Sequence, residues 1–311
     1  MHLGLLDHWV VMSLLAAAAW ALSCVIDVCF VDKGIYRRAS DGPAVAGLFC
    51  IVPALMASSS LDWTGVSWPI FGVGALSGIV FLLHIYFYFC ALFHLNDAVN
   101  AEIFNTLGVL IVPLLAFLFL GERLAWLNYI AIAIAVVGVL VLVGLQPSRL
   151  SRIAISYLVA SVVSVSLLMV MQAWVLQFAS YATTVWLFST TAFVTATLFF
   201  GVPEIRRRRI GDMCRRFGML FVLVQFLELG AVLGSQRATD LSPSVSLVAL
   251  IECSLPIFVM LFSLLIAACT KLWRSTRSQS LLPVLSCQNQ AAPSKVASML
   301  LILVAISLVQ T

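Results

Sequence analysis

Four carboxylic acids lie inside long apolar runs of this chain, namely Asp27, Glu102, Glu228 and Glu252. None of those runs contains a Lys or Arg that could neutralise an acid on the same segment. A charged carboxylate costs about 2.5 kcal/mol or more at the centre of a bilayer, so each should face a protein interior or a water-filled cavity. Loss of hydration there favours the protonated form. These acids are therefore candidates for relaying protons or for binding a cationic group.

Other polar side chains share helical faces with two of these acids. Asn105 and Thr106 follow Glu102 within about one turn, and Gln225 lies one turn before Glu228. Residues three or four apart are neighbours on the same side of a helix. We expect both groups to line one cavity, with Glu102 as the principal functional acid.

Two more polar residues, His84 and Gln172, lie in other apolar runs. We expect them to line the same cavity, which the first, third, fourth, sixth, eighth and ninth runs would enclose. Structural roles stay open as alternatives. Asp27 could bond the neighbouring backbone near the membrane boundary, and His84 could bond a backbone carbonyl of another helix.

The composition excludes a water-soluble protein. Of 311 residues, 63% are hydrophobic and 10% charged, whereas soluble domains carry about 25% charged residues. A helix needs about 20 apolar residues to cross a bilayer. We therefore predict an all-α integral membrane protein with ten transmembrane helices, at about 10–31, 43–59, 69–93, 98–120, 125–145, 153–176, 181–202, 217–236, 244–268 and 295–310.

The chain divides into two halves at the polar linker 146–152. Laying Pro113 on Pro256 aligns the fourth and ninth runs without gaps. An odd number of spans in each half would insert the second copy upside down, which is the inverted-repeat plan of secondary transporters. We predict one five-helix repeat over residues 1–147 and a second, divergent repeat over 148–311.

The basic residues indicate an orientation. Loops after odd-numbered runs hold 15 Lys and Arg, with Lys295 at the start of the tenth run counted among them, and loops after even-numbered runs hold 2. Cytoplasmic loops carry the excess of positive charge, so both termini are predicted outside the cytoplasm. The basic run Arg206–Arg209 then anchors the topology and is no nucleic-acid site. Short loops and the lack of a processing segment favour a bacterial inner (plasma) membrane.

Several other chemistries lack their motifs. No HExxH, GxSxG or P-loop occurs, so we predict neither an enzyme nor a bound cofactor or metal. Gly72, Gly74 and Gly78 fit close helix packing better than phosphate binding. The cysteines show no metal spacing, and six are expected as small buried apolar groups: Cys24, Cys29, Cys50, Cys90, Cys253 and Cys269.

The segment Phe117–Gly144, in which the turn Gly121–Glu122 separates two apolar helices, resembles the end of a repeat in the EamA type of the drug/metabolite transporter superfamily. The resemblance continues through Trp20–Lys33, and the helix with Pro256 is similar to the second copy. It implies ten helices in two inverted repeats around a central cavity, and alternating-access transport of small metabolites. The second half departs from the pattern because it lacks the Gly-Glu turn.

These features predict a secondary transporter for a small polar or cationic metabolite, coupled to protons. An uncoupled facilitator, in which the acids are structural, is one alternative. A non-transporting membrane scaffold is the other, with the fifth run, which bears Gly138 and Gly144, as its docking surface. That run is also the expected lipid-facing or subunit-contacting surface, which leaves a homodimer open.

Overall fold

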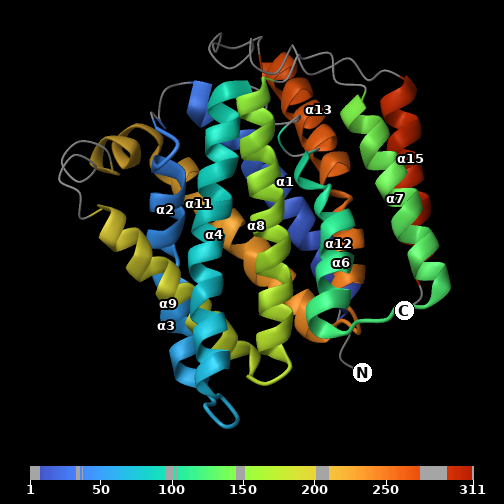
Figure 1. Ribbon diagram of the computed structural model, residues 1–311. Helices are drawn as coiled ribbons and strands as arrows, with labels where there is room; N and C mark the ends of the chain where they lie inside the picture. Colours follow the sequence, from blue (N-terminus) through green and yellow to red (C-terminus); the bar gives the residue numbers. More distant parts are fainter. Residues whose placement is uncertain are drawn as a thin grey trace, which may run out of the picture.

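The computed structural model describes residues 8–32, 36, 38–95, 101, 104–144, 151–200, 210–273 and 293–309. Within these residues every regular element is a helix, and the helices pack side by side in a bundle (Figure 1). Five helical segments in this part of the chain are long and apolar enough to cross a bilayer: Trp9–Asp27, Asp41–Ser60, Trp68–Leu95, Arg152–Leu176 and Val245–Ile266. The chain is thus an all-α protein with several helices suited to a membrane.

Unbroken helices follow the predicted apolar runs closely, because each run is bounded by polar or helix-ending residues. Only α11 differs appreciably, since it extends beyond the predicted 217–236 at both ends. The bounds are α1 Trp9–Asp32, α4 Trp68–Leu95, α7 Trp126–Gly144, α8 Arg152–Leu176, α9 Tyr181–Phe200, α11 Ile210–Leu241 and α15 Pro293–Ser307.

Two of the predicted runs break shortly before a proline. The second run divides at Cys50 into α2 (Asp41–Phe49) and α3 (Ile51–Ala57), followed by the short helix η2 (Ser58–Ser60). The ninth divides at Cys253 and Ser254 into α12 (Val245–Glu252) and α13 (Leu255–Trp273). A proline lacks an N–H and its ring crowds the carbonyl four residues earlier. Pro53 and Pro256 each lie three residues after the first residue of the break, where this disturbance falls.

The fourth run breaks without a nearby proline. Thr106 and Leu107 form a turn, and α6 (Gly108–Leu120) begins directly after it. Pro113 lies inside α6 and interrupts nothing upstream. Thr106 therefore lies in a turn outside α6.

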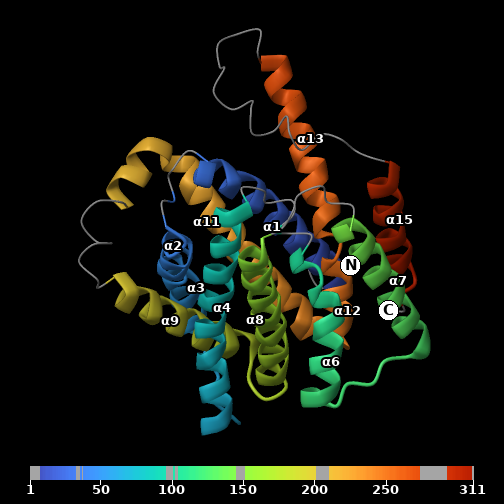
Figure 2. The ribbon, with the colours of Figure 1, turned by 45° about the horizontal axis from the view of Figure 1, so that its top comes forward.

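Helix pairs across the bundle form a regular pattern of contacts. α1 packs on α11 and α4 packs on α8, while α6 contacts α8 and both α12 and α13 contact α1. α2 and α3 pack on α9, α4 also contacts α9, and α7 packs on α15. The α7–α15 pair lies at one side of the bundle, away from α9 and α11 (Figure 2). The central helices α1, α4, α6, α8, α11 and α12 therefore surround the middle of the molecule.

Successive helical segments alternate in direction between the two ends of the bundle (Figure 1). Arg38 lies in the connection from α1 to α2 and Arg152 begins α8, both at one end. Arg123 lies in the connection from α6 to α7 and Arg237 near the end of α11, both at the other end. This arrangement agrees with the grouping of basic loops on which the predicted orientation depends.

Glycines allow close contacts between helices, as expected for two of the three on α4. A Cβ on Gly78 would lie 2.3 Å from the carbonyl oxygen of Phe188 on α9, and one on Gly74 would lie 2.8 Å from Leu187. Gly72 has no neighbour within 4 Å. The expectation of close packing thus holds for Gly74 and Gly78 and fails for Gly72.

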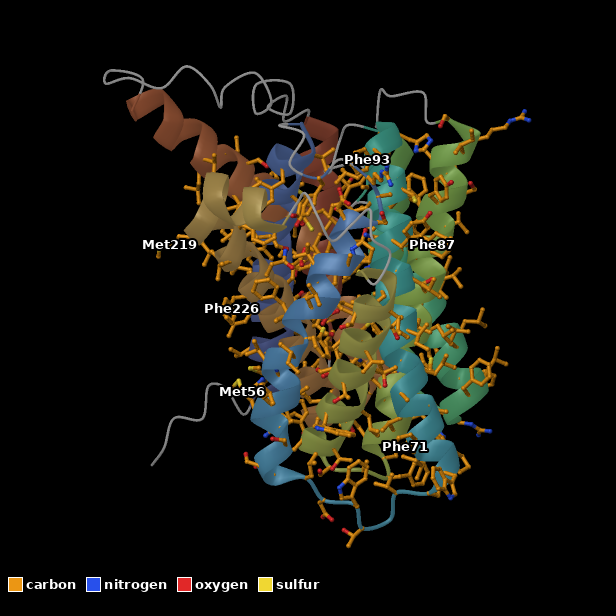
Figure 3. All side chains as sticks on the ribbon, turned by 90° about the vertical axis from the view of Figure 1, so that its left-hand side faces the viewer. Met56, Phe71, Phe87, Phe93, Met219 and Phe226 are labelled. Carbon is orange, nitrogen blue, oxygen red and sulfur yellow. The ribbon has the colours of Figure 1, made fainter. Side chains whose placement is uncertain are left out.

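Large apolar side chains cover the outside of the bundle. Met56, Met219 and Phe226 point away from it (Figure 3) and are 73%, 90% and 49% exposed. Such a surface fits lipid contact, because hydrocarbon tails are the environment in which exposed apolar groups cost nothing. Four of the six cysteines expected in the interior are buried, namely Cys24, Cys50, Cys90 and Cys253, while the side chains of the other two are not described.

Candidate functional site

Two helix breaks meet in the middle of the bundle. The thiol of Cys253 donates a hydrogen bond to the backbone carbonyl of Thr106 at 3.6 Å. Both breaks have the same tight turn, because the amides of Leu107 and Ser254 each bond the carbonyl three residues earlier at 3.0 Å. Breaks of this kind leave backbone groups outside the regular helical pattern. Discontinuous helices are accommodated at membrane depth where they are buried in protein or line a cavity.

A cavity of about 100 Å³ lies against these breaks. Water occupies about 10–15 Å³ of such space, so the cavity has room for several water molecules or a small solute. Its walls are mostly apolar. The polar side chains that line it come from α4, the fourth-run break, α8, α11 and α12, and are His84, Asn105, Thr106, Ser166, Gln172, Ser235 and Glu252.

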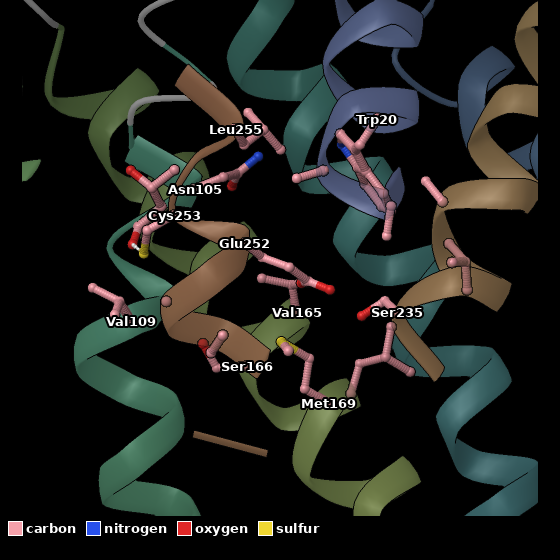
Figure 4. A pocket seen from close by; sticks show the side chains of 18 of the residues that line it. Trp20, Asn105, Val109, Val165, Ser166, Met169, Ser235, Glu252, Cys253 and Leu255 are labelled. Atoms are coloured by element: carbon pink, nitrogen blue, oxygen red, sulfur yellow. Dashed lines mark hydrogen bonds between the residues drawn. The ribbon is translucent and has the colours of Figure 1, made fainter. Parts of the chain in front are cut away.

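The carboxyl group of Glu252 extends across this cavity. Its side chain points toward Ser235 on α11, and Trp20 of α1 lies on the same side (Figure 4). Ser235 lines the same cavity. One carboxyl oxygen of Glu252, Oε1, is buried and has no hydrogen-bond partner among the described residues. Buried polar atoms are nearly always hydrogen-bonded, so this oxygen is suited to accept a bond from a bound solute or water.

Two further buried polar atoms at the cavity lack partners in the described part of the chain. They are Nε2 of Gln172, whose side chain is 5% exposed, and the hydroxyl of Ser166, which is fully buried. Both residues line the cavity. An amide offers donors and an acceptor, and a hydroxyl offers both. Together with Glu252, the cavity therefore presents an acid and two neutral hydrogen-bonding groups within apolar walls.

His84, which also lines the cavity, belongs to a hydrogen-bonded chain. Its Nδ1 lies 3.1 Å from the carbonyl oxygen of Ser161 and 3.0 Å from the hydroxyl of the same residue. The Ser161 hydroxyl donates to Oδ1 of Asn105 at 3.1 Å. A carbonyl can only accept, so Nδ1 carries the proton and Nε2 is an acceptor in the neutral ring. The chain joins α4, α8 and the fourth-run break.

A second, smaller cavity of about 20 Å³ lies beyond Trp20 and His84. Asp27 of α1 and Glu228 of α11 both line it, together with Tyr88. Trp20 and His84 line the larger cavity as well, with their ring centroids 5.9 Å apart. These two side chains therefore separate the acid-lined small cavity from the large one.

Seven of the predicted site residues line one of the two cavities. The larger one has His84, Asn105, Thr106, Gln172 and Glu252, and the smaller has His84 with Asp27 and Glu228. Gln225 lies elsewhere and donates to the hydroxyl of Tyr36 at 3.4 Å. Glu102, the acid expected to matter most, lies outside the described residues.

Four contributing residues were missed by sequence reasoning. Three of them, Ser161, Ser166 and Ser235, are single hydroxyl groups in apolar runs, and such residues commonly bond their own helix backbone, so they carry no distinctive signal. Trp20 was recognisable, because it shares a helical face with Cys24 and Asp27, and all three line the smaller cavity. Its placement between two cavities depends on the packing of α1 against α4, which the sequence alone does not predict.

The Gly121–Glu122 turn ties the two halves of the chain together. Gly121 ends α6 in the left-handed conformation, with φ of 67°, which glycine adopts without strain. Glu122 then accepts a hydrogen bond from the hydroxyl of Ser244. Ser244 also caps the first turn of α12 by accepting from the amide of Leu247 at 3.2 Å. A carboxylate there is favoured by the partial positive charge at a helix N-terminus.

Comparison with known proteins supports the fold alone. No protein-family model and no curated protein matches the chain. One solved chain, described only as the crystal structure of a protein, is 16% identical and superimposes with a TM-score of 0.61. The match covers 96% of this chain and 95% of the solved one. The helical arrangement is thus shared by a protein of known structure over nearly the full length of both.

Proposed function

We propose that the chain is a proton-coupled secondary transporter, which moves a small polar or cationic metabolite across the membrane by alternating access. The proposal includes ten membrane spans in two inverted repeats, 1–147 and 148–311, as the resemblance to EamA-type transporters implies. The protein would lie in the plasma membrane. The end of the bundle that holds Arg38 and Arg152 would face the cytoplasm.

The pattern of helix contacts supports two related halves. If the first run corresponds to the sixth, the second to the seventh and so on, each contact should have a counterpart. The contact of α1 with α11 then corresponds to that of α8 with α4, and the contact of α6 with α8 corresponds to that of α12 and α13 with α1. The contact of α2 and α3 with α9 is its own counterpart, and so is the contact of α7 with α15. Both halves also contain a helix break with the same hydrogen bond, at Leu107 and Ser254.

The observation that carries the proposal is the cavity between the two broken helices. Substrate sites of secondary transporters form at the repeat interface, where discontinuous helices expose backbone groups. Glu252 and the ring of Trp20 would attract a cation, and Gln172 would bond a polar group on the same molecule. No Lys or Arg is among the described residues that line the cavity, so an anionic substrate would meet only the acid.

A transport assay in proteoliposomes tests this function. Pooled amino acids, nucleosides, polyamines and cationic dyes are presented to the wild type, Glu252→Gln, Glu102→Gln and the control Asp62→Asn, which alters an exposed loop carboxylate. We expect solute-evoked current or lumenal pH change in the wild type and the control, and its loss in Glu252→Gln. Silence of correctly folded wild type with every pool, under gradients of both directions, would overturn the proposal.

The two alternatives give different results in the same assay. An uncoupled facilitator would take up solute without a pH change and would tolerate both glutamate variants. A scaffold would transport nothing and would depend on α7. Gly138 of α7 already faces α15, where its Cβ would lie 3.1 Å from Ile302. The glycine face expected to dock a partner helix is therefore occupied within the chain.

A further inference from the structure

Three buried polar atoms at the large cavity have no hydrogen-bond partner within the described part of the chain. They are Oε1 of Glu252, the hydroxyl oxygen of Ser166 and Nε2 of Gln172. All three residues line the same space of about 100 Å³. Buried polar atoms are nearly always hydrogen-bonded, so a solute that fills this cavity should offer a partner to each of them. The kinds of these atoms therefore indicate the chemistry of the solute.

The unbonded hydroxyl of Ser166 differs from its neighbour on the same helix. Ser164 donates to the carbonyl oxygen of Ala160 at 2.7 Å, as serines within helices commonly do. Ser166 makes no such bond with the described residues. Its oxygen lies beside the first residue of α6, since a Cβ added to Gly108 would be 3.4 Å from it. The hydroxyl of Ser166 is therefore held at the helix break that borders the cavity.

The three atoms form a pattern of two acceptors and one donor. A carboxylate only accepts, a hydroxyl accepts as well as donates, and an amide nitrogen only donates. A primary ammonium group carries several donors and no acceptor, so it can bond the oxygens of both Glu252 and Ser166. An oxygen elsewhere on the same molecule would then accept from Nε2 of Gln172. Trp20 lies on the side toward which the Glu252 carboxyl points (Figure 4), and its ring also attracts cations.

The size and charge of the cavity limit the solute further. An apolar cavity of about 150 Å³ holds benzene, so about 100 Å³ suits a molecule of about four or five non-hydrogen atoms. Such a molecule has room for about two carbon atoms between its nitrogen and its oxygen. The residues known to line the cavity include no Lys or Arg. A carboxylate on the solute would therefore meet no opposite charge from them and would be repelled by Glu252.

We propose that the substrate is a small primary amine with a neutral oxygen two carbon atoms from its nitrogen, as in an amino alcohol or an amino acid amide. Its ammonium group binds Glu252 and Ser166, and its oxygen accepts a hydrogen bond from Gln172. Amino acids are excluded, because a carboxylate takes the place of the neutral oxygen. This inference rests on the proposed function and narrows its substrate from small polar or cationic metabolites to one class.

Equilibrium binding of radiolabelled ethanolamine to the purified protein in detergent tests this class at one fixed pH. Three unlabelled compounds of similar size compete against it. Propylamine has a methyl group in place of the hydroxyl, glycinamide has a neutral amide there, and glycine has a carboxylate. We expect glycinamide to compete about as well as ethanolamine. Propylamine should bind roughly 2- to 10-fold more weakly, as expected for the loss of one hydrogen bond, and glycine at least about 100-fold more weakly because of charge repulsion.

Four variants locate the contacts. Glu252→Gln should weaken ethanolamine and propylamine binding alike by roughly 30-fold or more, since it removes the charge that pairs with the ammonium group. Ser166→Ala should weaken both by roughly 2- to 10-fold. Gln172→Met, which has a similar size and no donor, should remove the preference for ethanolamine and leave propylamine binding within about twofold. Ser164→Ala is the control and should change neither. If Gln172→Met fails to fold, Gln172→Leu replaces it, and the competition on wild type still decides the class.

The outcomes separate this inference from the proposed function. Equal competition by glycine and glycinamide, or an unchanged preference for ethanolamine in correctly folded Gln172→Met, would overturn the substrate class. A wild type that binds none of these amines but transports another pooled solute would also overturn it and would leave the proposed function standing. A wild type that binds the amines in the expected order but moves no solute in proteoliposomes would overturn the proposed function and keep the binding site. A wild type that neither binds nor transports would overturn both.

Discussion

Substitution of Gly78 by alanine should destabilise the contact between α4 and α9. The added Cβ would lie 2.3 Å from the carbonyl oxygen of Phe188 and 2.8 Å from the amide nitrogen of Ala192. Both atoms belong to the backbone of α9, so no side-chain rotation relieves the contact. α9 would have to move by roughly 1 Å to restore an ordinary van der Waals separation of about 3.5 Å.

The same substitution at Gly72 isolates the packing effect. Gly72 lies on α4 and has no neighbour within 4 Å, so alanine there brings only its higher helix propensity, worth about 1 kcal/mol. Gly78→Ala gains the same helix propensity, but overpacking lowers its free energy of unfolding by about 1–3 kcal/mol. The difference between the two variants therefore equals the packing cost, about 2 kcal/mol, which corresponds to about 3 °C in Tm for a chain of this length.

Thermal unfolding of both variants in one detergent measures this difference. Loss of the monodisperse peak after heating gives an apparent Tm for each protein, with wild type as the reference. We expect Gly72→Ala at or above the wild-type value and Gly78→Ala several degrees below Gly72→Ala. Equal Tm values for the two variants would refute the close approach of α4 to α9 and with it the placement of the helix that carries His84.

Three further predictions concern the site and its supports. Glu122→Ala, which removes the acceptor of the Ser244 hydroxyl, should weaken the tie between the halves by about 1.5–3 kcal/mol, which faster labelling of Cys253 by a small thiol reagent would show, and unchanged labelling would contradict. Ser161→Ala should lower Tm, because His84 and Asn105 lose a shared partner, whereas Ser164→Ala on the same helix should not; equal effects would dispute the hydrogen-bonded chain. Gly121→Ala should cost about 1 kcal/mol, since φ is 67° and alanine is strained there; a Tm at or above wild type would contradict this.

The limits of most helices were predictable from the sequence, because the apolar runs end at polar residues or at glycine and proline. The helices that line the larger cavity were also predictable, since the polar residues within those runs are few and must avoid lipid. The helix breaks were only partly predictable from the sequence. Pro256 explains the turn at Cys253, whereas no proline follows the turn at Thr106 within one helical turn, and that turn contacts Cys253 of the other half.

An alignment of the two halves by their apolar runs can differ by one helical turn from the pairing that their helix breaks indicate. The alignment on Pro113 and Pro256 pairs Leu107 with Leu250, but the turns in the structure pair Leu107 with Ser254, one helical turn further on. Four residues is close to one turn of 3.6 residues, so this shift keeps the same faces apolar and leaves the predicted cavity helices correct.

The register of the turns changes how the two halves contribute to the cavity. It pairs Asn105 with Glu252, so that an amide in the first half corresponds to an acid in the second, and both line the cavity. In the proposed transporter, a neutral group opposite a charged one would give a bound cation a single preferred orientation between the two halves. If Asn105→Asp were made, two carboxyl groups would flank the cavity, and a monovalent cation should bind in two orientations while a dication should gain affinity over it. An unchanged preference between propylamine and a diamine would contradict this reasoning.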